Sequence, residues 1–421
     1  MDIKDKLRKL DPANNKEKLN KNDKIKNDKS KVSVPSSQNL SSNKNKIISC
    51  LGGKIKKNEK GKFFSCKKEY KFDYCHGSYP LAKIKECNKI NLKYIFNIDL
   101  KNPLGYKDFL FIDTETTGLA GGTGTVPFMV GIGYFSGKQF IVEQFFLRDF
   151  DEEGALLQEL KRILSEYPAL VSFNGKSFDL PLINTRLVLH RYNRLKTNRH
   201  FDLLHAARRI WSHLDSCSLD HLENKKLNIT RHNYLPGSEV PAIYFDYLQN
   251  KKPDILKPVF RHNLIDIISL VTLLNHLNSI FSGEIESELS SRELFNLGKV
   301  YEKDKQYKIC INYLKKARQK VGSKYLLTEI EKKLSWQYKR RESWDKAVQI
   351  WKTMIHDNRG RLFPYIELAK FYEHQAKKYL KAKRYTKKAL VNLKEKRRIT
   401  TDYQNKKQEL EYRLNRLNDK I

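Results

Sequence analysis

Four carboxylates are the residues in this sequence with the clearest capacity for chemistry. Asp113 and Glu115 lie two residues apart at the end of the apolar run FLFID. Side chains two apart on a β-strand point to the same face. Asp179 lies at the start of a predicted helix, in NGKSFD, and Asp266 lies inside an apolar helix that also carries His262. A compact sheet would bring these four element ends together.

Such a cluster of acids predicts a metal centre. Clustered carboxylates repel each other strongly unless divalent cations lie between them. Oxygen-only ligands suit Mg²⁺ or Mn²⁺ better than zinc. Two such ions, roughly 4 Å apart, can activate a water molecule and stabilise both oxygens of an in-line phosphoryl displacement. We therefore expect two Mg²⁺ or Mn²⁺ ions and phosphodiester hydrolysis.

Each acid taken alone also has a simpler interpretation. Asp179 fits a helix N-cap, and Asp266 could pair with Arg261 or Lys257. The DxE pattern could indicate an aspartyl-phosphate phosphatase, although that chemistry usually has a second Asp where Glu115 stands. The Gly-rich stretch that follows lacks the GK[ST] ending of a phosphate loop, so it more simply shapes the turn between two strands. The four acids in this order favour the metal site.

The elements that must position the acids follow from apolar periodicity. Three strands in a meander, then alternating helix and strand, predict an α/β ribonuclease-H-like domain with a mixed sheet flanked by helices. The predicted strands are Phe109–Asp113, Phe128–Phe135, Gln139–Leu147, Ala169–Phe173 and Arg199–Leu203. The predicted helices are Glu152–Glu166, Leu180–Arg191, pieces of Arg208–Leu227, and Pro258–Leu277.

Three motifs, DTETTG, NGKSFD and HNLIDIISL, resemble those of the DEDD 3′–5′ exonucleases, which are related to polymerase proofreading domains. The bacterial YprB-like group of ribonuclease-H-like proteins is a closer resemblance, through HFDLL, RRIW, SLDHLE and Pro236-Gly237. The resemblance covers roughly residues 105–280. It implies that the four acids are catalytic metal ligands and that His262 is the general base. We assign substrate binding to Thr114, Thr116, Asn174 and Asn263.

The position of His262 departs from both standard patterns of that superfamily. One class has Tyr, and the other has His with four residues between it and the last Asp. Here three residues separate His262 from Asp266, which places both on one helix face. An imidazole with a pKa near 6.5 can accept a proton from water at neutral pH, but it is shorter than a phenol. His200, or the metal ions alone, remain alternatives, and Asn174 could simply stabilise its turn.

The charge indicates an anionic partner. The formal net charge is +34, with +10 in residues 1–60, +18 in residues 284–421 and only +6 between them. We expect single-stranded DNA or RNA first and an anionic membrane surface second; a generally Lys-rich proteome is the alternative. Six scattered cysteines without CxxC suit a reducing cytoplasm. No apolar run reaches the ~18 residues of a membrane span, and we expect no secretory signal.

We expect four regions. Residues 1–60 are a disordered basic arm, 61–104 an N-terminal extension, 105–283 the exonuclease domain, and 290–421 tetratricopeptide-like helical repeats. Leu297-Gly298-x-x-Tyr301 begins a pattern that recurs after 37 and then 34 residues, and Arg397–Ile421 forms a charged capping helix. These repeats could hold a protein partner or a nucleic acid.

Together these features predict a cytoplasmic, metal-dependent 3′–5′ exonuclease acting on single-stranded nucleic acid. Two alternatives remain open at this point. One is a non-catalytic nucleic-acid-binding scaffold with a degenerate nuclease domain and protein-binding repeats. The other is a structure-selective endonuclease of the same fold.

Overall fold

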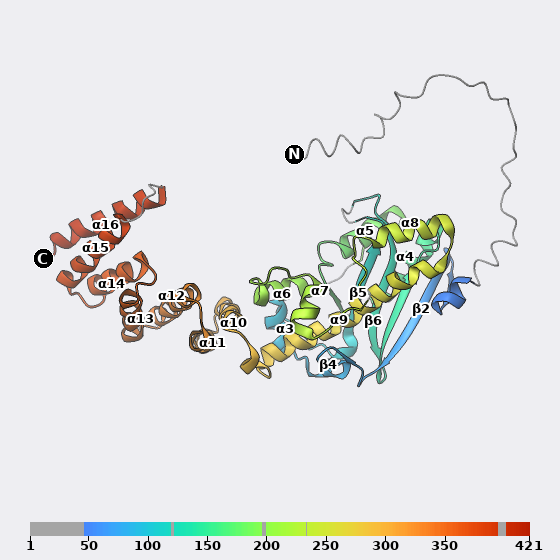
Figure 1. The fold of residues 1–421 in the computed structure, drawn as a ribbon, viewed down its shortest axis with the longest axis horizontal. Helices are drawn as coiled ribbons and strands as arrows, with labels where there is room; N and C mark the ends of the chain where they lie inside the picture. Colours follow the sequence, from blue (N-terminus) through green and yellow to red (C-terminus); the bar gives the residue numbers. More distant parts are fainter. Residues whose placement is uncertain (1–45, 119–121, 196–198, 233, 395–400) are drawn as a thin grey trace, which may run out of the picture. The chain divides into compact units, whose positions relative to one another are not determined.

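The computed structural model describes residues 46–118, 122–195, 199–232, 234–394 and 401–421 (Figure 1). The chain divides into two units, Met1–Lys46 and Ile47–Ile421. Only Lys46 of the first unit is described, so most of the predicted basic arm lies outside the described residues. All that follows concerns the second unit.

A seven-stranded mixed sheet forms the centre of the nuclease-like domain (Figure 1). β5, β6 and β7 form the predicted antiparallel meander, while β8 and β9 lie parallel to β5. The order across the sheet is β1-β2-β7-β6-β5-β8-β9. The bounds are β1 Lys54–Asn58, β2 Gly61–Lys71, β5 Phe109–Thr116, β6 Pro127–Ser136, β7 Gln139–Phe146, β8 Ala169–Ser172 and β9 His200–Asp202.

Two of these strands come from the region assigned to the arm and the extension. β2 pairs along its length with β7, and β1 pairs with β2 as a hairpin. The predicted boundary at residue 60 therefore falls inside a hairpin of the sheet. The remainder of the extension, β3 Cys75–His76, β4 Tyr79–Pro80, the 3₁₀ helix η3 Leu81–Glu86 and α3 Lys89–Phe96, packs against the long helix α9.

Both faces of the sheet are buried, because alternate side chains of β5 enter two different cores. Phe109 and Phe111 join one core with the apolar side of α9, whereas Leu110 and Ile112 join the other. This explains why β5 is a continuous apolar run and does not alternate with polar residues. Helices α4 Glu153–Glu166, α5 Asp179–Leu189 and α8 Val240–Asn250 contribute to the second core; α8 was not predicted from the sequence.

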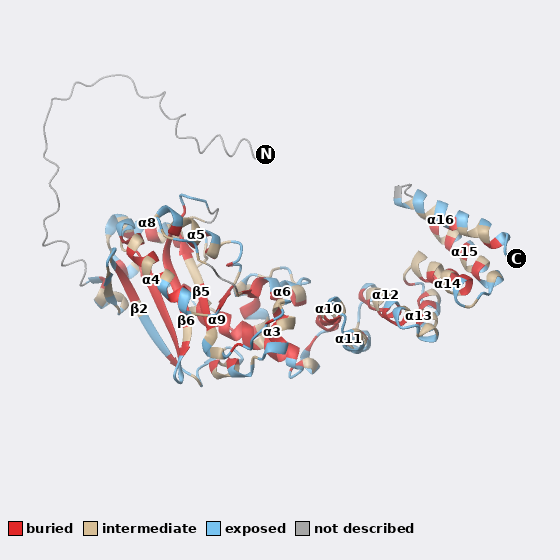
Figure 2. Ribbon diagram, turned by 180° about the vertical axis from the view of Figure 1, so that it is seen from behind, coloured by how far each residue is buried: buried red, intermediate tan, exposed pale blue. Residues whose placement is uncertain are grey.

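Helix α9, Lys257–Ser282, is the central helix of the domain. Pro258 lies in its first turn, where a missing N–H is tolerated, and Gly283 ends it at a φ of 84°. Most of its residues are buried, as the red colouring shows (Figure 2). The segment Pro253–Ser282 is long and apolar enough by composition to cross a bilayer, but 78% of its apolar window is buried in protein, as expected for a core helix.

In the described residues after α9, seven α-helices follow, each in contact with the next. They are α10 Ser291–Lys303, α11 Tyr307–Lys320, α12 Lys324–Arg340, α13 Trp344–His356, α14 Leu362–His374, α15 Tyr379–Lys394 and α16 Thr401–Asn418. The positions predicted to repeat are buried, including Leu297, Leu334 and Leu368. At Gly298 an added Cβ would lie 3.2 Å from Leu314 Cδ2, so α10 and α11 approach closely there.

Candidate active site

Strand β5 presents Asp113 and Glu115 on one face, as the two-residue spacing predicts. In the antiparallel register Asp113 faces Gly131 and Glu115 faces Met129 on β6. The register shifts just after Glu115, between it and Thr116. β-Bulges of this kind end strand pairing and redirect side chains, and they are frequent beside active sites.

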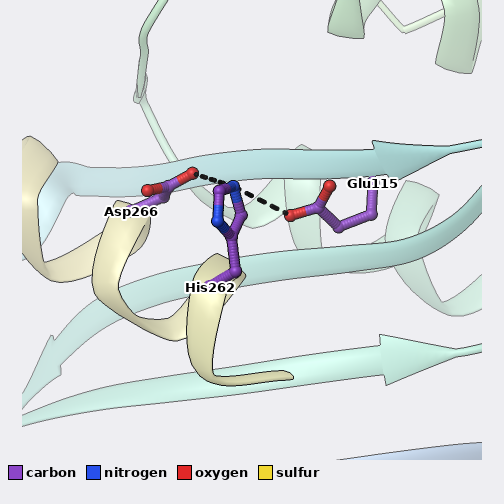
Figure 3. A group of neighbouring side chains, drawn as sticks. All are labelled: Glu115, His262 and Asp266. Atoms are coloured by element: carbon purple, nitrogen blue, oxygen red, sulfur yellow. Dashed lines mark ion pairs between the residues drawn. The ribbon is translucent and has the colours of Figure 1, made fainter. Parts of the chain in front are cut away.

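Helix α9 brings His262 and Asp266 to the same place, one turn apart (Figure 3). His262 Nε2 lies 3.3 Å from Asp266 Oδ2 and 3.8 Å from Glu115 Oε1. The imidazole therefore stands between an acid of the strand and an acid of the helix. One ligand atom from each of these three residues lies within 4.8 Å of the others.

Asp179 is the first residue of α5 and reaches the cluster from the other side of β5. Thr114, which points away from Asp113 and Glu115, donates its hydroxyl hydrogen bond to Asp179 Oδ1. The fourth acid is thus fixed by a residue of the DTETTG motif itself. Thr114 was predicted to bind substrate, but its hydroxyl is already committed to Asp179 in this structure.

Three of the four acids have a raised pKa. Burial, and then the charges of Asp266, Glu115 and Asp179, raise the pKa of Asp113 well above its ordinary value. Burial and the charges of Asp266 and Asp179 raise the pKa of Glu115 to about 8. Burial also raises the pKa of Asp179 to about 6, against the hydrogen bond from Thr114. Each ionised acid is therefore costly until a cation neutralises the group.

The residues present suit a divalent cation. Glu115 Oε1 is buried, and no hydrogen-bond donor in the described part of the chain reaches it. A buried carboxylate oxygen without a donor is unfavourable, whereas it is an ordinary ligand of Mg²⁺ or Mn²⁺. The carboxylates supply oxygen ligands of the kind that Mg²⁺ and Mn²⁺ take, and His262 adds one imidazole nitrogen beside them.

A buried amide holds Asp113 in place. Asn263 is fully buried, and its Nδ2 donates to Asp113 Oδ2 at 3.0 Å. Its Oδ1 accepts from Gln144 Nε2 at 3.0 Å, and Gly131 leaves the space it occupies. The sequence analysis assigned Asn263 to substrate binding. Its full burial suits it instead to positioning Asp113.

The loop that delivers Asp179 is held by Asp202, a residue that the sequence analysis did not single out. The backbone amides of Asn174, Lys176 and Leu204 all donate to its carboxylate, at 2.9 to 3.0 Å. Asn174 adopts a left-handed backbone conformation with a φ of 64°, and its side chain is exposed. Its backbone therefore stabilises the turn, while its side chain stays accessible.

Two candidates from the sequence remain: Thr116, assigned to substrate binding, and His200, the alternative general base. Thr116 is buried, and its hydroxyl donates to the Gly118 carbonyl at 2.8 Å, which shapes the loop after β5. His200 Nε2 is 2.7 Å from Ser172 Oγ, and burial lowers the pKa of His200 to about 4. That hydrogen bond ties His200 to strand β8, whereas His262 lies directly against two of the acids.

An arginine that the sequence analysis also missed completes the cluster. Arg231, in the loop before α8, binds Glu223 through Nε and Nη2 at 2.5 and 2.6 Å. Its Nη2 also donates to Asp266 Oδ1. Glu223 belongs to the SLDHLE motif and lies in the π-helical turn η6, Glu223–Leu227. The sequence analysis quoted SLDHLE as part of the family resemblance. No local pattern in the sequence connects Glu223 with Asp266, which lies 43 residues later.

The sheet order, the acids of β5 and α9, and the family comparison agree on the class of protein. A family model of the ribonuclease H superfamily matches residues 110–278. The chain belongs to the family of the uncharacterized protein YprB of Bacillus subtilis (strain 168). The two are 32% identical over 325 residues, which cover 75% of this chain and 77% of YprB.

Two polymerases show shorter similarities. DNA polymerase 1 of Aeropyrum pernix is 58% identical over 38 residues, which are 9% of this chain and 4% of the polymerase. The solved family B DNA polymerase of Pyrobaculum calidifontis matches 46% of this chain and 28% of its own, with 15% identity and a TM-score of 0.31. The chain thus spans a small part of either polymerase.

Proposed function

We propose that this protein is a metal-dependent nuclease, and more specifically a 3′–5′ exonuclease that hydrolyses single-stranded nucleic acid with two bound Mg²⁺ or Mn²⁺ ions. Membership of the ribonuclease H superfamily supports nuclease chemistry. The observation that carries the finer proposal is the meeting of Glu115 on β5 with His262 and Asp266 on α9, with Asp113 and Asp179 near enough to interact with these acids electrostatically.

The four carboxylates are the groups that would hold the ions. A divalent cation bound there supplies Lewis-acid activation of the attacking water and stabilises charge on the phosphoryl oxygens. Asn263 orients Asp113, and Thr114 orients Asp179, so two of the acids are aimed before any cation binds. Such preorganised ligands avoid reorganisation at the moment of reaction.

His262 is the group that we assign to proton transfer. Its Nε2 is within 4 Å of carboxylates on both β5 and α9, so a nitrogen able to accept a proton stands beside the groups that would hold the ions. The same geometry also lets Nε2 serve as a metal ligand beside Glu115 and Asp266. Loss of metal affinity in a His262 variant would identify the ligand role, and loss of rate alone the base role.

The charge distribution supports an anionic polymer as substrate. A net charge of +34 favours binding through phosphates, so binding should weaken steeply as salt rises. We propose a cytoplasmic location. We also propose that the helical region, whose paired helices resemble tetratricopeptide repeats, binds a partner. A groove of about 690 Å³ between α11, α12 and α13 is one candidate surface.

End-labelled single-stranded RNA and DNA test the proposal directly. The full chain would be incubated with each 5′-labelled strand in Mn²⁺, Mg²⁺ or EDTA, beside Asp113→Asn. We expect metal-dependent shortening from the 3′ end that the variant lacks. Internal fragments would indicate an endonuclease, and intact strands with salt-sensitive binding would indicate a non-catalytic scaffold.

A further inference from the structure

Arg231 is a fixed positive charge in contact with a proposed metal ligand. Its side chain is 9% exposed, and that of Asp266 is 13% exposed. Asp266 Oδ1 accepts from Arg231, and Asp266 Oδ2 lies 3.3 Å from His262 Nε2. Both oxygens of this acid therefore have cationic or polar neighbours, in contrast to Glu115, whose Oε1 has no donor.

Glu223 holds Arg231 in this orientation. It is fully buried and takes two nitrogens of the guanidinium, a planar arrangement that fixes the side chain. The Ser269 hydroxyl of α9 also hydrogen-bonds to Glu223, and Ser269 Oγ lies 2.8 Å from His76 Nε2. Strand β3, η6 and α9 thus build one polar network that ends at Asp266.

A buried ion pair is expensive to desolvate, and here one guanidinium is shared by two carboxylates. Arg231 binds Glu223 through one side of its guanidinium and also donates to Asp266. From this geometry we propose that Arg231 is a positioning residue that restrains Asp266 and offsets one negative charge of the acid cluster. Asp266 then offers mainly its Oδ2 side to a cation.

This inference rests on the proposed metal-binding function and makes it more specific. A site that contains its own cation attracts divalent ions less strongly than four uncompensated acids would. It also folds at a lower electrostatic cost when no metal is bound. Removing the guanidinium should therefore tighten metal binding, which a purely structural Arg231–Glu223 pair would not do.

Metal titration of the full chain tests this inference. Mn²⁺ affinity would be measured by calorimetry or electron paramagnetic resonance for the wild type, Arg231→Gln and the double variant Glu223→Gln/Arg231→Gln. The double variant removes both buried charges and so avoids leaving Glu223 unpaired. The net charge does not change, but the positive charge that is removed contacts Asp266 directly, whereas the negative charge lies beyond it. We therefore expect the double variant to bind Mn²⁺ at least about threefold more tightly than the wild type.

The chain offers a matched control in the pair Arg186–Glu153. This pair is also bidentate and largely buried in the same domain, with two bonds of 2.5 Å. Arg186 also donates to the Thr123 carbonyl, and Glu153 also contacts His190. Glu153→Gln/Arg186→Gln should leave Mn²⁺ affinity unchanged. Equal or weaker Mn²⁺ binding by the Glu223/Arg231 double variant would overturn the inference alone. No Mn²⁺ binding by the wild type would overturn both it and the proposed function.

Discussion

The amide of Asn263 and the carboxylate of Asp113 meet across the interface of α9 and β5, with Nδ2 donating to Oδ2 at 3.0 Å. They are 150 residues apart in the chain. The contact exists because Gly131, opposite Asp113 on β6, has no side chain. One glycine therefore makes room for the group that aims a proposed metal ligand.

Gly131→Ala should lower activity without altering any acid. The new Cβ would lie 2.1 Å from Asn263 Oδ1, so Asn263 must move. We expect a loss of at least about tenfold in cleavage rate and about 1–3 kcal/mol in the free energy of unfolding. Single-turnover cleavage and urea unfolding would measure these. Gly237→Ala, where a Cβ meets open space, is the control. Wild-type behaviour of Gly131→Ala would contradict the positioning role of Asn263.

Asp113→Asn should abolish cleavage yet raise the melting temperature of the protein in EDTA. Without metal, the wild type holds Asp113 near three other acids that raise its pKa, so neutralising it relieves repulsion. Adding Mn²⁺ should stabilise the wild type more than the variant. Thermal unfolding with EDTA and then with Mn²⁺ measures both effects. A lower melting temperature of the variant in EDTA would count against a repulsive cluster.

His262→Ala should slow cleavage by about 10²–10⁴-fold if Nε2 takes the proton. Single-turnover kinetics at saturating Mn²⁺ separates this effect from weaker metal binding. His356→Ala is the control, because His356 ends α13 and its side chain is 89% exposed. A change below threefold in His262→Ala would exclude the general-base assignment.

Glu293 should make the junction between α10 and the nuclease domain acid-sensitive. Burial alone would raise its pKa, but hydrogen bonds from Lys226 and Ser290 lower it to about 2. Trp211 Nε1 also donates to it at 2.7 Å. A carboxyl whose folded pKa lies below its unfolded pKa stabilises the fold above the unfolded value, near 4.5, and loses that contribution as the pH falls toward 2.

The corresponding comparison is Glu293→Gln against the wild type across pH 7 to 2. The wild type should be more stable at pH 7, by at most roughly 3 kcal/mol, and the difference should vanish toward pH 2. Other charged or titratable groups also face Glu293, but the wild type and the variant share them, so they cancel in the comparison. These groups are Lys226, Arg292, His213 and His276. Glu284→Gln, whose side chain is 47% exposed, should show little effect. A pH-independent difference would refute the argument.

The sequence was sufficient to predict those elements and side-chain positions that depend on neighbouring residues in the chain. Apolar runs and turns located β5 through β9, and the strand period placed Asp113 and Glu115 on one face. The hairpin β1–β2 was missed because its sequences, KIKKN and GKFFSCKKEYK, are rich in lysine and show no regular apolar alternation. Helix α8 was missed because Pro241 and a run of aromatics hide its periodicity.

Residues that act through distant partners could not be found in this way. Asp202, Glu223 and Arg231 are polar residues near turns, where solvent exposure is the ordinary expectation. Their roles depend on contacts such as Arg231 with Asp266, 35 residues apart. The motifs HFDLL, which contains Asp202, and SLDHLE, which contains Glu223, were signals in the sequence, but neither indicated a partner.

The hairpin β1–β2 has a consequence for the behaviour of the folded chain in concentrated solution. An unpaired outer strand can template pairing with a strand of another molecule, and lysines on a short outer strand oppose this. β1 spans only five residues, and three of them are Lys54, Lys56 and Lys57. The long, apolar strand β7 is covered on that side by β2, so the border of the sheet carries charge that protects the protein from aggregation.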